Sequence, residues 1–113
     1  MAQSSKGAFE VRVSIELHKL LTSIDEEHKF WLWIIKMKEE LLSNRTCGQS
    51  IHKKRIPDYY KRKYGVNNLY RYSHPEGYRS CYSLIGNEEG NICANILDLM
   101  SHPEYEDRFG YKM

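Results

Sequence analysis

The sequence is poor in cysteine and proline, with three of each among its 113 residues. No two cysteines form a CxxC pair, and an odd number of them suits a reducing compartment, so we expect a cytoplasmic protein. The five histidines are scattered without the spacing of zinc ligands. We therefore expect neither a structural metal nor any other cofactor.

Long apolar runs are also missing. The longest, residues 30–35, is far shorter than the ~20 residues that span a bilayer. Residues 1–7 are polar and no apolar segment follows them, so we expect neither a signal peptide nor a membrane partner. A hydrophobic content of 41% suffices for one modest core. These features predict a disordered tail over residues 1–7 and a single domain over residues 8–113.

Acidic residues are scarce in one stretch of the second half. Between Lys53 and Tyr72 the chain has seven basic residues and one acid, Asp58, although the net charge is only +2. Such a stretch on a nearly neutral protein is typical of a nucleic-acid-binding surface, and a solvated helix face is the alternative. Several tyrosines lie in the same half; we expect most to pack in the core and one or two to stack on unpaired bases.

Hydrophobic periodicity predicts an α+β fold. Strict alternation of apolar and polar residues indicates a strand over residues 9–16. Apolar residues at helical spacing then indicate two helices. The second helix should start at Ser23 or Asp25, where there is a capping-box pattern, and end near Ser43. A loop over 44–50, a basic helical stretch over 51–56 and a helix that Pro57 opens and Gly65 stops should follow. The remaining segments predict strands at 68–73, 79–85 and 92–100. The order is β-α-α-β-β-β, with the helices on one face of the sheet and part of the other face open.

Three patterns carry a family resemblance in the second half of the chain. They are IPxxYxxKYGVNNLYRY at 56–72, GYRxxY at 77–82 and LDLMSHPEY at 97–105. From residue 56 to 111 the sequence resembles the RelE/ParE toxin superfamily, in particular small archaeal-type RelE-like mRNA interferase toxins. The first half resembles this family by topology alone. The resemblance implies a RelE-like arrangement with a small, mostly antiparallel, twisted sheet.

The same resemblance implies a function. Members that cut mRNA do so without a metal, through attack of a ribose 2′-OH on the adjacent phosphate. It implies the toxin component of a type II toxin–antitoxin system, an endoribonuclease that acts on mRNA at the ribosome and is held by a cognate antitoxin protein. A ParE-like gyrase-inhibiting toxin and a non-catalytic RNA- or protein-binding module on the same scaffold are the alternatives.

Four residues are the candidates for catalysis. Arg79 matches the strand arginine of the family, and a guanidinium grips two phosphate oxygens at once; a surface pair with Glu76 is the alternative. Arg71 is the second candidate arginine and must point to the same sheet face as Arg79. His102, just beyond the last predicted strand, is a candidate general acid or base, although it also fits the start of a helix. Tyr105 would assist through a hydrogen bond or by stacking on a base.

The basic residues complete the expected site. Those of the 51–56 stretch resemble the basic helix that other members aim at the scissile phosphate, and those of the next helix would attract backbone phosphates. Members that use a glutamate base carry it near this region, where the sequence offers only Asp58. The predicted RNA-binding residues are Lys53, Lys54, Arg55, Lys61, Arg62 and Lys63.

Overall fold

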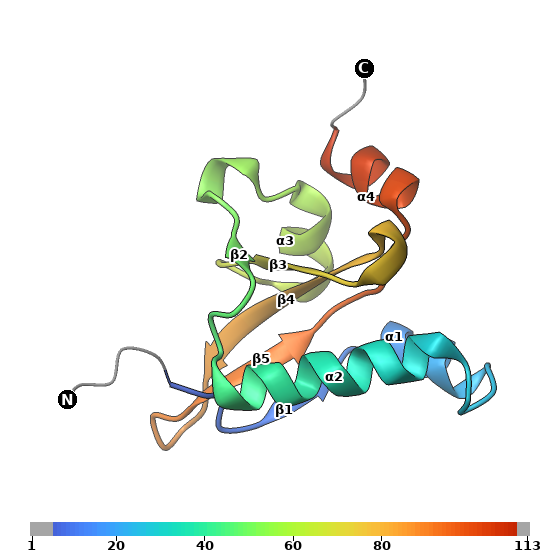
Figure 1. The fold of residues 1–113 in the computed structure, drawn as a ribbon. Coiled ribbons are helices and arrows are strands. Elements are labelled where there is room, and N and C mark those ends of the chain that lie inside the picture. The colour runs from blue at the N-terminus through green and yellow to red at the C-terminus, as the bar shows by residue number, and fades with distance from the viewer. Residues whose placement is uncertain (1–5, 111–113) are drawn as a thin grey trace.

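A five-stranded sheet separates two pairs of helices in the computed structural model of the protein, which describes residues 6–110 (Figure 1). The elements in chain order are β1 (Val11–Val13), α1 (Ile15–Thr22), α2 (Lys29–Ser43), β2 (Gln49–Ser50), the 3-10 helix η1 (Lys53–Arg55), α3 (Asp58–Tyr64), β3 (Tyr70–Ser73), the 3-10 helix η2 (Pro75–Gly77), β4 (Arg79–Gly86), β5 (Ile92–Ile96) and α4 (His102–Phe109).

The sheet is mixed, with the strand order β1-β5-β4-β3-β2. The first strand, β1, runs parallel to β5, and every other neighbouring pair is antiparallel. The predicted α+β class is therefore confirmed. The edge strand β2 lies within the segment 44–50, which the sequence predicts as a loop. Only two of its residues pair with β3, and a strand this short shows no alternation of apolar and polar residues in the sequence.

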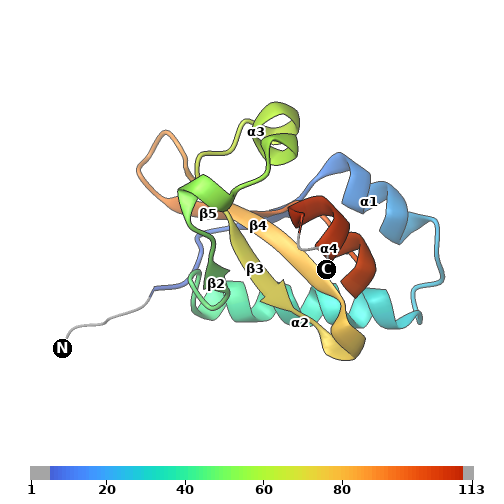
Figure 2. The ribbon, with the colours of Figure 1, turned by 90° about the horizontal axis from the view of Figure 1, so that it is seen from above.

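Helices cover both faces of the sheet, so the prediction that they pack on one face is wrong. Tyr82 of β4 faces a core that it shares with α1 and α2, whereas the adjacent Cys81 faces a second core with Tyr60 of α3 and Tyr105 of α4. Successive residues of a strand point to opposite faces, which separates these two cores. Figure 2 shows α4 over β4 while α2 runs along the other side. The face of the sheet that was expected to be open is thus partly covered by α3 and α4.

Polar side chains set where the first two helices begin. Ser14 caps α1, accepting the Leu17 N–H at 3.0 Å, so the predicted strand 9–16 ends early. Ser23 ends α1, and α2 begins at Lys29, where the ring of His28 accepts a backbone N–H. The prediction of a capping box at Ser23 is therefore wrong.

The chain beyond β5 forms a helix. The predicted strand 92–100 ends at Ile96, and Met100 returns to the sheet only as an isolated bridge to Arg79. A capping box made by Ser101 and Glu104 then begins α4. The helix-start interpretation of this segment is confirmed, and His102 occupies the first turn. Upstream, Gly65 ends α3 with a positive φ of 65°, as predicted.

The sequence predicts a tail over residues 1–7, of which residues 1–5 lie outside the described part of the chain. The backbone carbonyl of Lys6 accepts a hydrogen bond from the Arg45 N–H at 2.9 Å, so the tail is shorter at this end than predicted. Within residues 6–110, no helix is both long enough and apolar enough to cross a membrane.

His74 is a buried polar group where β3 ends. Its Nε2 lies 2.8 Å from the hydroxyl of the fully buried Ser80, and its ring stacks on Trp33. Burial lowers the pKa of His74 to about 4. The imidazole is therefore neutral in the folded protein at physiological pH.

We expect the folded state to lose stability on mild acidification because of His74. The unfolded chain takes up a proton near pH 6.5 and the folded chain only near the lowered pKa of about 4, so the free energy of unfolding falls across this window. The loss by pH 5 should be on the order of 1–2 kcal/mol. Urea unfolding at pH 7 and pH 5 measures it. His74→Gln should reduce the pH dependence, whereas the exposed-site control His18→Gln should leave it unchanged; equal slopes in both variants would contradict this expectation.

Candidate active site

Arg71 and Arg79 lie on the same sheet face. The β3–β4 register pairs Arg71 with Cys81 and Ser73 with Arg79, which makes the two arginines diagonal neighbours. Both guanidinium groups lie over the ring of Tyr105, with their central carbons 5.8 Å and 5.1 Å from its centroid. The condition set by the sequence, that the two arginines share a face, is met.

Tyr105 forms the floor beneath the arginines. It projects from α4, is 3% exposed, and stacks against Phe109 with ring centroids 4.3 Å apart. An aromatic face attracts cations, so the ring favours two guanidinium groups side by side despite their like charge. Covered in this way, Tyr105 is placed to hold Arg71 and Arg79 and not to stack on a base.

His102 contacts Arg79 directly. The two side chains meet at 2.7 Å between Arg79 Nη1 and His102 Nδ1, and the other ring nitrogen, Nε2, lies 2.9 Å from a carboxylate oxygen of Glu106. A guanidinium can only donate, so Nδ1 accepts and the ring proton of the neutral imidazole is assigned to Nε2, facing Glu106. The result is a chain of donors and acceptors from Arg79 through His102 to Glu106. We call Arg71, Arg79, His102, Tyr105 and Glu106 together the arginine–histidine site.

Sequence reasoning missed Glu106. It sought a carboxylate near the basic stretch, where Asp58 instead begins α3. The available signal was the four-residue spacing from His102, which places the two side chains on one helix face. That signal has meaning only once the segment after Ser101 is known to be helical.

Each arginine of the site retains unused donors. Arg79 also donates to the Gly77 carbonyl at 3.2 Å, and Arg71 donates to the side chain of Gln49. The Nε groups of both arginines are buried and have no hydrogen-bond partner among residues 6–110. An unpaired buried donor costs about 1–3 kcal/mol, and both of these Nε groups are covered from solvent. Glu76, the alternative partner for Arg79, pairs with Lys29 instead, at 2.6 Å.

The predicted RNA-binding residues divide into groups. Arg55 reaches the site, because it lines a hollow of about 320 Å³ together with Arg71 and Tyr105. Lys53 and Lys61 line a separate hollow of about 240 Å³. Three further residues are exposed and line neither hollow: Lys54, Arg62 and Lys63. Lys63 pairs with Glu16 of α1 at 3.4 Å. The structure therefore brings one residue of this set beside the arginine–histidine site.

A buried polar network fixes α3 and α4 against β4 beneath the site. Asp98 accepts the Tyr60 hydroxyl at 2.5 Å and the Cys81 N–H at 2.8 Å, and Arg108 approaches it at 3.6 Å. Burial raises the pKa of the Asp98 carboxyl despite these partners. Because Arg108 and Tyr105 share α4, this network also sets the position of the tyrosine floor.

No family model matches this chain, and no curated protein or solved structure matches it either. Within residues 6–110, no group of three or more His, Cys, Asp or Glu side chains is arranged to hold a metal ion. The function is therefore inferred from the arginine–histidine site and from the residues around it.

Proposed function

We propose that the protein is an endoribonuclease that cleaves RNA without a metal ion, through attack of a ribose 2′-OH on the adjacent phosphate. The contact between Arg79 and His102 carries the proposal. It places a permanent cation 2.7 Å from a nitrogen that can accept a proton. Attack by a 2′-OH requires both functions, because a proton must leave the hydroxyl while negative charge grows on the phosphate.

The arginines bind and stabilise the phosphate. Arg71 and Arg79 both lie over one aromatic ring, and both residues are partly exposed. A phosphate placed between them accepts from both guanidinium groups, and the extra charge of the transition state strengthens these bonds. Arg55, at the edge of the same hollow, extends the cationic path along the RNA backbone.

His102 is the base in this scheme. When Arg79 turns to the phosphate, Nδ1 of His102 is released and takes the proton of the 2′-OH. Glu106 holds the Nε2–H and stabilises the imidazolium that forms. The 2′-oxygen bonds to phosphorus and the bond from phosphorus to the 5′-oxygen breaks. A water molecule, which reaches this exposed histidine, gives a proton to the leaving 5′-oxygen and takes the proton held by His102, so the neutral imidazole is restored. The products carry a 2′,3′-cyclic phosphate and a 5′-hydroxyl.

The biological role follows from the resemblance of residues 56–111. We propose that the protein is the toxin component of a type II toxin–antitoxin system, that it acts in the cytoplasm on mRNA at the ribosome, and that an antitoxin protein restrains it. The succession from β1 to β5 supports this, because it is β-α-α-β-β-β once β2, α3 and the two 3-10 helices are set aside; the helix α4 then follows β5.

Purified protein should cleave naked mRNA in EDTA as well as in magnesium, and ribosomes supplied in magnesium should increase the rate. End-group analysis should find 2′,3′-cyclic phosphate and 5′-hydroxyl termini in every condition, because the 2′-OH is the nucleophile. A requirement for a divalent metal, or 5′-phosphate ends, would reject the mechanism. RNA binding without cleavage would favour the binding module, and growth arrest with intact mRNA and inhibited gyrase would favour the ParE-like alternative.

A further inference from the structure

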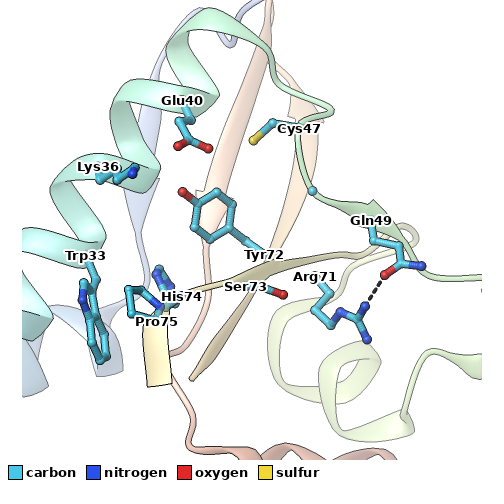
Figure 3. Close-up of a pocket in the computed structure, with 11 residues that line it drawn as sticks. Trp33, Lys36, Glu40, Cys47, Gln49, Arg71, Tyr72, Ser73, His74 and Pro75 are labelled. Carbon is cyan, nitrogen blue, oxygen red and sulfur yellow. Dashed lines mark hydrogen bonds between the residues drawn. The ribbon is translucent and has the colours of Figure 1, made fainter. Parts of the chain in front are cut away.

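A groove of about 620 Å³ opens between α2 and the edge of β3, on the sheet face opposite the arginine–histidine site (Figure 3). Its volume lies within the range of small-molecule binding sites. Lys36 and Glu40 of α2 and Tyr72 of β3 point into it, and Trp33 lines one end. The groove thus combines both signs of charge with hydroxyl and aromatic groups.

The groove meets the proposed catalytic site at the edge of the sheet. Arg71 and Gln49 line it, and the same two residues line the hollow that contains Tyr105. The hydrogen bond from Arg71 to Gln49 crosses this junction (Figure 3). A nucleotide whose phosphate contacts Arg71 at this edge can therefore extend around the edge and place its base in the groove.

Two charged groups of opposite sign lie one helical turn apart in the groove. Lys36 and Glu40 are four residues apart on α2 and share one face of the helix. The Tyr72 hydroxyl is turned toward Glu40, and burial together with this carboxylate raises the pKa of the tyrosine, so the hydroxyl keeps its proton. A carboxylate accepts about four hydrogen bonds, so Glu40 has acceptor positions left beyond this tyrosine.

We propose that the groove binds the guanine base of the nucleotide beside the scissile phosphate. The N1–H and N2–H groups of guanine donate to Glu40, and its O6 accepts from Lys36. The proposal rests on the proposed function for the identity of the neighbouring phosphate, whereas the recognition of the base rests on the groove alone. Hydrogen bonds to the Watson–Crick edge of an unpaired base are the usual means of sequence-specific RNA recognition.

The other three bases fit this pair of charges less well. Adenine and cytosine present an unprotonated ring nitrogen at the position where guanine presents N1–H, and that lone pair would face the Glu40 carboxylate. Uracil has one ring N–H, but a carbonyl oxygen flanks it on each side, so one oxygen would face Glu40. A polar group of the base that is left without a partner, or that faces a like charge, provides the discrimination.

Calorimetric titration with the four nucleoside 3′-monophosphates tests the proposal without any need for cleavage. We expect 3′-GMP to bind about tenfold more tightly than 3′-UMP, in line with charge-assisted hydrogen bonds. Glu40→Gln should remove this preference, and Glu39→Gln, an exposed neighbour outside the groove, should retain it. Lys36→Gln, at an exposed position, provides a second test if Glu40→Gln fails to fold. Equal affinity for all four nucleotides, or a guanine preference that survives both groove variants, would overturn the proposal.

Mapping of cleavage sites separates this inference from the proposed function. Cleavage with an unchanged base preference in Glu40→Gln would reject the guanine groove and leave the endoribonuclease standing. A Glu40-dependent preference for 3′-GMP in a protein that cleaves no RNA would do the reverse.

Discussion

Arg79→Ala is expected to slow RNA cleavage by about two to three orders of magnitude, the usual effect of losing a donor aimed at the developing charge of a transition state. The fold should survive, because the backbone bridge between Arg79 and Met100 does not involve the side chain. Single-turnover cleavage of a short RNA measures the loss, and thermal unfolding confirms that the variant is folded.

Arg12→Ala is the matched control for Arg79→Ala. Arg12 lies on the same sheet face, in β1, and pairs with the exposed Glu10 at 3.1 Å. Its removal changes the net charge equally but leaves the arginine–histidine site intact, so it should lower the rate only slightly. Arg79→Lys should fall between wild type and Arg79→Ala, since an ammonium supplies charge without the fork of donors. Equal rates for Arg79→Ala and Arg12→Ala would remove Arg79 from the mechanism.

His102→Ala is expected to lower the cleavage rate by about 10²–10⁴-fold, the range for a general acid or base. RNA affinity should change little, because the imidazole moves a proton and the arginines bind the phosphate. The residue is exposed in the first turn of α4, where alanine favours helix formation, so stability should be retained. Two measurements test this: the cleavage rate at saturating RNA, which should fall, and the Kd for an uncleavable 2′-deoxy analogue, which should change little.

Added imidazole should restore part of the activity of His102→Ala, because a small base can enter the space left by the side chain. The exposed His18→Ala on α1 should be as active as wild type and insensitive to imidazole. Glu106→Gln should show a smaller loss in rate at unchanged affinity, since it keeps the size of the side chain but loses the charge that supports an imidazolium. Full activity of His102→Ala would assign the base to another group.

The sequence was most informative where local periodicity decides the structure. The sequence predicts strands over 68–73 and 79–85, and the shared face of Arg71 and Arg79 then follows from the observed hairpin register. The short strand β1 and the helix α2 are likewise predicted by their own apolar patterns. These patterns lie within each segment, so spacing alone carries the information even where, as for β1, the pairing strand is distant in sequence.

Features that depend on distant residues escaped prediction. Tyr60 and Cys81 belong to a second core, but a buried residue shows the same pattern whichever side of a sheet covers it, so the two-sided packing was missed. Glu106 lies beside His102 only because α4 is a helix, and a helix there was one of two alternatives that the sequence left open. Glu40 and Tyr72 meet across the groove from separate elements, and no local pattern links them.

The parallel pairing of β1 with β5 has a consequence for synthesis on the ribosome. Val11 pairs with Ala94 and Val13 with Ile96, so the sheet cannot be completed until Ile96 has been made. Contacts of such wide sequence separation slow folding, and until they form the apolar faces of α1 and α2 have only part of their cover. The arginine–histidine site is assembled later still, because His102 and Glu106 follow β5. In a nascent chain the arginine–histidine site therefore cannot form until Glu106 has left the exit tunnel.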